Sequence, residues 1–344
     1  MNEWRDPAAG RRLTGGLLTV HAHPDDETLS NGALLATWAA SGRPVTVVTC
    51  TRGEQGEVIG LDLAHLEGDG PALAAHRETE LAGALAALGV EDHVFLDTVE
   101  LLGAVGEPAP HADGCATASR RFVDSGMSWA TTGRATAPEQ VPAGAFVTVP
   151  LDDAAARLAV VLRDRRPDVV VCDEPGGGYG HPDHVQAHLV VQRALGLAAS
   201  TDAHLPGEPH RVTAALWTVL DEATLRTGYA AVRALDGERA LGGSGIPWVV
   251  PDPTGPVPSA AVSAVDLAVA VRPVLNRVLA ALRAHATQVQ GVQQVPEAAA
   301  PQVVAVYALS NDVLLPVLSS ETYRLAPGPW AGPVDWPVGV TAVA

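Results

Sequence analysis

Apolar stretches of strand length alternate, over the first 200 residues, with longer stretches rich in alanine and leucine. Strands are expected at 16–23, 45–50, 93–97 and 168–174, and helices at 29–41, 71–89, 152–165 and 183–195. The expected strands are almost uninterrupted in hydrophobicity, which indicates burial on both faces. Buried strands separated by helices form a mostly parallel sheet with right-handed crossovers. The pattern therefore predicts an α/β, Rossmann-like fold with helices on both faces of the sheet.

The pattern after residue 200 is less regular. Strands are expected at 211–220 and 264–271, and a helix at 272–289, followed by a proline-punctuated tail. We interpret residues 1–200 as a Rossmann-like catalytic core with an insertion rich in glycine, proline and alanine near 101–149. Residues 201–344 are expected to complete the sheet and cap the active site, as an irregular C-terminal part that is not an independent domain.

The composition of the chain excludes or disfavours several classes of function. The 344 residues include 22 basic and 39 acidic ones, a net charge of −17, which disfavours nucleic acid and anionic lipid as partners. All basic residues are arginine, so Schiff-base chemistry and a Walker-type phosphate loop, which need a lysine, are excluded. No apolar stretch has the length of a membrane span, and the first residues lack the apolar segment of a signal peptide. We expect a soluble, cytoplasmic protein, and the sequence does not indicate an oligomeric state.

Two polar clusters follow predicted strands. HAHPDDE (21–27) comes directly after the first strand, and DEPGGGYGHPDHV (173–185) follows a later one. In open α/β sheets, ligands bind in the crevice beyond the carboxyl ends of the strands. Two clusters of histidine and aspartate at two strand ends can therefore converge on one point.

Metal-assisted hydrolysis is the chemistry that such a set of side chains supports. A catalytic zinc ion typically takes three protein ligands, from histidine nitrogen or carboxylate oxygen, and keeps one position for water. His23 and Asp26 can supply two ligands and the second cluster a histidine. Asp25 could then act as base toward the metal-bound water, and His181 could stabilise charge or donate a proton. A site of this type also accepts iron(II), so the residues do not fix the metal.

The segments HAHPDDETLSNG and GYGHPDH resemble the LmbE-like (PIG-L) N-acetylglucosaminide deacetylases. Further segments are similar to the branch of that family that serves mycothiol biosynthesis: VVTCTRGEQGEVIG, RFVDSGM, AHATQV and ALSNDVLLPVLSSETYRLA. The resemblance implies zinc-dependent hydrolysis of the N-acetyl group of a glucosaminyl-inositol, giving the free amine and acetate. Alternatives are a mycothiol S-conjugate amidase, a deacetylase of another N-acetylglucosaminyl compound, and a catalytically silent member. Sister amidases carry a lysine near the first motif, which this chain lacks.

Carried over by position, the resemblance implies a complete set of site residues. The implied metal ligands are His23, Asp26 and His184. The implied catalytic residues are Asp25 as general base, His181 as electrostatic stabiliser and general acid, Asp183 as its orienting partner, and Tyr179 as a hydroxyl donor to the oxyanion. The implied substrate-binding residues are Arg77 and Asp124, toward sugar and inositol hydroxyls, and Met127, which would line the pocket.

Two residues keep alternative interpretations. Glu27 could cap the helix after the first motif or support a ligand histidine from behind. His285, in AHATQV, could cap the end of its own helix or reach the pocket. The sequence does not decide between these roles.

Overall fold

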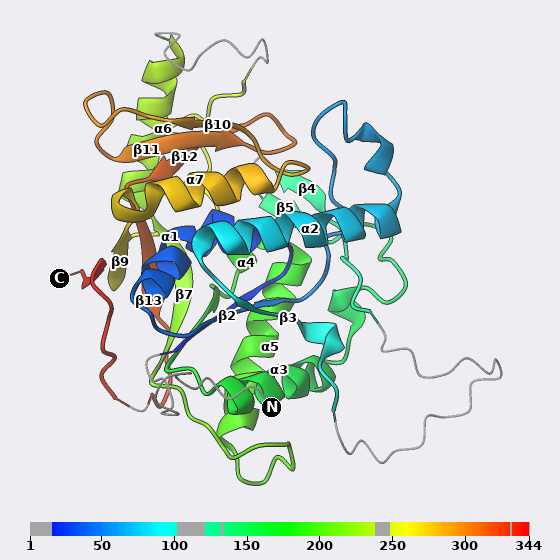
Figure 1. Ribbon diagram of the computed structural model, residues 1–344. Coiled ribbons are helices and arrows are strands. Elements are labelled where there is room, and N and C mark those ends of the chain that lie inside the picture. Colours follow the sequence, from blue (N-terminus) through cyan, green and yellow to red (C-terminus); the bar gives the residue numbers. More distant parts are fainter. Residues whose placement is uncertain (1–15, 102–120, 132–133, 238–247, 331, 344) are drawn as a thin grey trace.

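A computed structural model describes residues 16–101, 121–131, 134–237, 248–330 and 332–343. Its main feature is a large mixed sheet with the strand order β14-β9-β13-β7-β6-β1-β2-β3, in which β8 pairs with β7 (Figure 1). The strands of this sheet are β1 (Leu17–His21), β2 (Val45–Thr49), β3 (Asp92–Phe95), β6 (Val169–Asp173), β7 (Ala214–Asp221), β8 (Ala261–Val262), β9 (Leu267–Ala270), β13 (Ser320–Leu325) and β14 (Val340–Ala342). The α/β, Rossmann-like fold predicted from the pattern is confirmed.

The pairing of the strands changes from parallel to antiparallel at β7. The strands β3, β2, β1, β6 and β7 run parallel to their neighbours. Beyond β7, the strands β13, β9 and β14 pair antiparallel. Helices connect the strands of the parallel half, because parallel neighbours need crossover connections. These helices cover the sheet and bury its apolar strands.

Helices cover both faces of the sheet (Figure 1). The helices are α1 (Asp26–Ala40), α2 (Gly70–Leu88), α3 (Leu151–Arg165), α4 (Gly177–Gly180), α5 (Pro182–Ala199), α6 (Glu222–Gly237) and α7 (Leu275–Ala284). Alternate strand residues define the two cores: Leu17 and Val169 pack toward α1, α2 and α7, whereas Leu18 and Val170 pack toward α3 and α5. Because side chains alternate along a strand, each central strand contributes to both cores.

A small antiparallel sheet lies beside α6 and α7 (Figure 1). It contains β10 (Gln290–Gln294), β11 (Val303–Ala308) and β12 (Leu314–Leu318). This sheet and α6 were not predicted, although α6 buries Leu225, Tyr229 and Val232 at helical spacing. The helix expected at 272–289 is shorter than predicted: it ends at Ala284, where His285 leaves the helical conformation with ψ 55°.

The insertion near 101–149 contains a two-stranded sheet, β4 (Ser128–Thr131) and β5 (Arg134–Thr136), among its described residues. Residues 102–120 of the insertion, including Cys115, lie outside the described residues. Cys50 and Cys172 are buried free thiols. In the described part of the chain, no helix is long and apolar enough to cross a membrane. The proposed division at residue 200 stays a prediction.

Candidate active site

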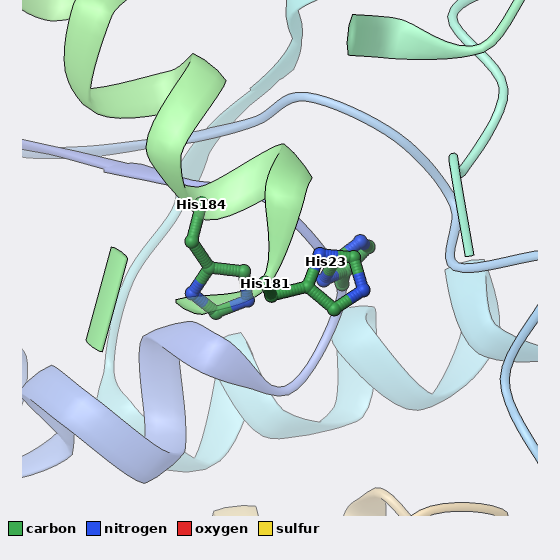
Figure 2. A group of neighbouring side chains, drawn as sticks. All are labelled: His23, His181 and His184. Carbon is green, nitrogen blue, oxygen red and sulfur yellow. The ribbon is translucent and has the colours of Figure 1, made fainter. Parts of the chain in front are cut away.

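The two predicted polar clusters meet at the carboxyl ends of β1 and β6. These strands are parallel neighbours, with Leu17 opposite Val169, so the segments that follow them emerge side by side. Figure 2 shows the imidazoles of His23, from the first cluster, and of His181 and His184, from the start of α5, facing one another. The ring centroids lie 4.6 Å apart for His23 and His181 and 5.2 Å apart for His181 and His184.

Asp26 lies between two of these histidines. Its Oδ2 atom is 3.5 Å from Nδ1 of His23 and 3.3 Å from Nε2 of His184. One ring nitrogen of each of the three histidines, His23, His181 and His184, also lies within 4.8 Å of a ring nitrogen of each of the other two. These four residues are buried. The structure therefore holds a buried histidine and aspartate cluster of the composition that binds a divalent metal ion.

The charges around His23 fit a bound cation. Its Nε2 atom lies 3.2 Å from Oδ2 of Asp183 and 3.4 Å from Oδ1 of Asp124, and Asp26 lies on its other side. Three buried carboxylates around one imidazole repel one another unless a positive charge lies among them. A divalent ion held by His23, Asp26 and His184 would supply that charge, so the residues present fit the predicted metal.

His184 has a partner that the sequence analysis missed. Its Nδ1 atom lies 2.9 Å from Oδ2 of Asp173, the last residue of β6. Both ring nitrogens are buried and make no well-directed hydrogen bond within the described part of the chain, so their contacts with Asp173 and Asp26 are charge contacts. Burial lowers the pKa of His184, but Asp26 and Asp173 together raise it to about 8. A carboxylate behind a histidine that leaves the other nitrogen open is the usual arrangement of a metal ligand.

Asp25 is the first residue before α1 and has a strained backbone. Its φ of 123° and ψ of −32° are rare for a residue with a side chain, and the carboxylate does not cap the helix. Its Oδ2 atom instead pairs with Nη2 of Arg77 at 3.2 Å. Burial raises the pKa of Asp25 to about 6, against the opposing effect of Arg77. Backbone strain at a buried carboxyl that does not cap its helix is typical of a functional site.

Asp183 supports two histidines with different atoms. Its main-chain N–H donates to Nδ1 of His181 at 3.1 Å, while its carboxylate lies beside His23 and accepts from the main-chain N–H of Ser125 at 2.8 Å. This contact of Asp183 with His181 runs through the backbone, and the role of Asp183 in orienting His181 stays a prediction. Burial, reinforced by His23 and His184, lowers the pKa of His181 to about 2.

Tyr179 is presented by a tight glycine-rich loop. Its ring centroid lies 5.2 Å from that of His184 and 6.0 Å from that of His181. Gly177 has a φ of 65°, and a Cβ atom there would lie 2.8 Å from the main-chain nitrogen of Val185. The loop can therefore approach α5 this closely only with glycine at that position.

The three predicted substrate-binding residues surround the cluster. Arg77 is buried under the loop after β2, and its Nη1 donates to the carbonyl oxygen of Gly53 at 2.8 Å. Asp124 is buried and accepts from the main-chain N–H of Gly126 at 2.8 Å. Met127 is half-buried. The structure brings Asp124 to His23 and Arg77 to Asp25, and the contacts of all three residues with a sugar stay predictions.

Glu27 lies behind the site. Burial would raise its pKa, but His285 and the Thr28 hydroxyl lower it to about 2. His285 Nε2 lies 2.8 Å from its Oε1. His285 is the residue that ends α7, and its side chain contacts Glu27, while its Nδ1 atom makes no hydrogen bond within the described residues.

The profile of the GlcNAc-PI de-N-acetylases, PIG-L, matches residues 18–195. The chain therefore belongs to the PIG-L family, as the motifs indicated. The 1D-myo-inositol 2-acetamido-2-deoxy-alpha-D-glucopyranoside deacetylase of Kineococcus radiotolerans is 42% identical over 323 residues, which cover 93% of this chain and 79% of that relative. The deacetylase of the same description from Streptomyces avermitilis is 40% identical over 321 residues, which cover 92% of this chain and 94% of that relative.

Solved structures add evidence on the fold. GalB, the 4-carboxy-2-hydroxymuconate hydratase of Pseudomonas putida KT2440, is similar with a TM-score of 0.50 and 14% identity. The match covers 93% of this chain and 99% of that one. A hydratase on the same fold shows that the reaction must be argued from the site and not from the fold.

Proposed function

We propose that this protein hydrolyses the N-acetyl group of an N-acetylglucosaminyl-inositol, releasing acetate and the free amine. The observation that carries the proposal is the buried cluster in which Asp26 lies between His23 and His184. Relatives about 40% identical over more than nine-tenths of the chain are deacetylases of this compound class. The reaction would be one step of mycothiol biosynthesis, as the resemblance of the motifs implies.

A zinc ion, or iron(II) in its place, would be held by His23, Asp26 and His184. Such an ion polarises an amide carbonyl and lowers the pKa of a water molecule that it binds to about 7. Asp173 would keep the His184 imidazole oriented, because it lies 2.9 Å from Nδ1 and leaves Nε2 toward the cluster.

Asp25 would carry the proton. Its carboxylate accepts a proton from the water as the oxygen attacks the acetyl carbonyl. When the C–N bond of the resulting tetrahedral intermediate breaks, the same carboxyl returns this proton to the departing amine nitrogen. Arg77, 3.2 Å from the carboxylate, would hold Asp25 in place through both steps.

His181 would act mainly as a hydrogen-bond donor. Its Nδ1 atom accepts from the main-chain N–H of Asp183, so in the neutral imidazole the proton is on Nε2. That Nε2–H and the Tyr179 hydroxyl can both donate to the oxyanion of the tetrahedral intermediate. A neutral histidine held in this tautomer has no surplus proton for the amine, which favours Asp25 as the donor over His181.

Amide hydrolysis of three compounds tests the proposal, followed as acetate release from the two N-acetyl compounds and as release of the free amine from the conjugate. The protein, loaded with one metal at known stoichiometry, is given the N-acetylglucosaminyl-inositol, free N-acetylglucosamine and a mycothiol S-conjugate. The first should have a kcat/KM at least 10-fold above the second, because unpaired polar groups in the site cost about 1.5–3 kcal/mol each. Faster turnover of the conjugate would instead identify an amidase, and no turnover of any compound would identify a silent member.

A further inference from the structure

Glu27 and His285 form a buried pair next to Asp25. Neither side chain has a part in the reaction proposed above. Both are completely excluded from solvent. Nε2 of His285 lies 2.8 Å from Oε1 of Glu27, and the hydroxyl of Thr28 donates to the same oxygen at 2.5 Å. Removing two ionisable side chains from water costs free energy, so a contribution to the stability of the fold is a weak explanation for this pair. The residues that the pair holds in position are a better one.

The other carboxylate oxygen of Glu27 reaches the predicted base. Oε2 accepts from the main-chain N–H of Asp25 at 2.9 Å. Asp25 has a φ of 123°, and a backbone conformation this rare persists only where surrounding contacts enforce it. Arg77 holds the Asp25 carboxylate, whereas Glu27 holds its peptide nitrogen.

We propose that His285 and Glu27 are positioning residues for Asp25. His285 fixes the Glu27 carboxylate, and Glu27 holds the Asp25 peptide in the strained conformation that keeps the Asp25 carboxylate off the helix terminus and in the site. This inference rests on the proposed function, because it depends on Asp25 acting as the base.

The turn that contains His285 is anchored independently. The main-chain N–H and the hydroxyl of Thr287 donate to the two carboxylate oxygens of Glu80, at 2.8 and 2.6 Å. Glu80 belongs to α2, which also carries Arg77. The C-terminal part of the chain thereby sets the geometry of a residue in the first motif.

Three variants separate positioning from folding. His285→Leu removes the donor to Glu27, His285→Gln restores a side-chain N–H, and Thr287→Val removes a buried hydrogen bond of the same turn that does not involve Glu27. We expect His285→Leu to lower kcat about 10- to 100-fold, as loss of an outer partner of a catalytic group does, with KM and metal content near wild type. His285→Gln should recover most of that loss, and Thr287→Val should lower the melting temperature without a comparable loss of kcat.

Equal losses of kcat in His285→Leu and Thr287→Val would overturn the proposal, because they would show a general disturbance of the turn. If the leucine variant does not fold, His285→Asn replaces it, since asparagine is polar but one methylene too short to reach Glu27 as glutamine does. Failure of glutamine to exceed asparagine in kcat would then be the contrary result.

A double-mutant cycle with Asp25→Asn tests whether His285 acts through Asp25. Residues that act through one another are not additive, so His285→Leu should change the residual kcat of Asp25→Asn by less than about twofold. Full additivity would contradict the inference. If Asp25→Asn turns over normally, the base in the proposed function is wrong. The inference is then judged by crystal structures of His285→Leu, in which a φ of Asp25 still near 123° would disprove the positioning contact.

Discussion

The parts of the chain before and after residue 200 contribute to the site in different ways. The segments that follow β1 and β6, including the first residues of α1 and α5, carry all the predicted metal ligands and the predicted base. The chain after residue 200 contributes supporting contacts, such as Ser259 to the Tyr179 loop and His285 to Glu27. The reactive groups of this molecule thus come from the first part, and the second part helps to hold them in place. Substitutions in the first part should abolish chemistry, and those in the second should tune it.

The largest effect is expected from the metal ligands. His23→Ala, Asp26→Ala or His184→Ala each removes one of three protein ligands, so metal content after dialysis should fall severely. Activity should fall by at least about 10³-fold, because metal stabilisation of the developing charge is worth several kcal/mol. Metal analysis and acetate release measure both effects.

Two further variants complete that comparison. His93→Ala is the matched control, since His93 lies on β3 and contacts Thr49 at 3.0 Å, away from the cluster; it should keep its metal. His181→Ala should also keep its metal, because Asp26 is the predicted third ligand. Metal loss in His181→Ala together with full occupancy in Asp26→Ala would exchange the two assignments.

The next largest effect is expected at the base. Asp25→Asn should retain the metal but lose about 10²–10⁴-fold in kcat, the usual contribution of a positioned general base. Because Asp25 contacts Arg77 and not the metal ligands, occupancy should match wild type. Near-normal turnover with full metal content would show that another group takes the proton from water.

The sequence predicted the first half of the molecule well for a physical reason. Buried parallel strands read as continuous apolar runs, and the polar residues directly after them can only project beyond the sheet. Asp173 could have been found by the same signal, since it directly follows the run DVVVC. The later part was predicted only in part: β9 lies within the strand expected at 264–271, whereas β13, a largely polar and partly exposed strand, and the helix α6 were not expected.

The partners of the supporting residues were beyond sequence reasoning. Glu174 lies in the second polar cluster and His285 in the AHATQV segment, but neither segment indicates which residue they contact, and Ser259 lies in no motif named above. Their partners lie 85 residues away for Glu174 and Ser259 and 258 residues away for Glu27 and His285. Only the folded chain brings these pairs together, so their roles follow from tertiary contacts and not from spacing.

A smaller effect is expected from Ser259. Its hydroxyl lies 3.0 Å from Oε1 of Glu174 and 2.8 Å from the carbonyl oxygen of Gly178, while Glu174 accepts from the main-chain N–H of Gly178 at 3.1 Å. These contacts hold the loop that presents Tyr179. Ser259→Ala should therefore lower kcat about 2- to 10-fold, which corresponds to one hydrogen bond of 0.5–1.5 kcal/mol.

Tyr179→Phe provides the background that tests this role. If Ser259 acts by placing the Tyr179 hydroxyl, Ser259→Ala should have little further effect on kcat once that hydroxyl is absent. A loss of the same size in both backgrounds would show that Ser259 does not act through Tyr179.

The smallest effect on activity is expected at Glu321, where the antiparallel half meets α1. Its carboxylate accepts from the main-chain N–H groups of Ala33 and Leu34, at 2.6 and 2.9 Å, and from the hydroxyl of Tyr323 at 2.8 Å. Burial nevertheless raises the pKa of Glu321 to about 7. Since Glu321 contacts none of the predicted site residues through these bonds, Glu321→Gln should keep kcat within about twofold of wild type.

The effect of Glu321 should appear in the free energy of unfolding and not in kcat. A carboxyl with a higher pKa in the folded than in the unfolded state binds its proton more tightly when folded, so its stabilising contribution is complete below about pH 4.5 and is lost as the pH rises through about 7. Urea unfolding at pH 5 and pH 8.5 should therefore show wild type losing roughly 1–3 kcal/mol relative to Glu321→Gln over this interval, at about 1.4 kcal/mol per pKa unit. Glu222→Gln is the control, because Glu222 is only partly buried and pairs with Arg226 at 2.9 Å; this variant should track wild type. If the difference between wild type and Glu321→Gln is the same at both pH values, Glu321 is ionised in the folded protein throughout, and the hydrogen bonds from α1 and Tyr323 outweigh its burial.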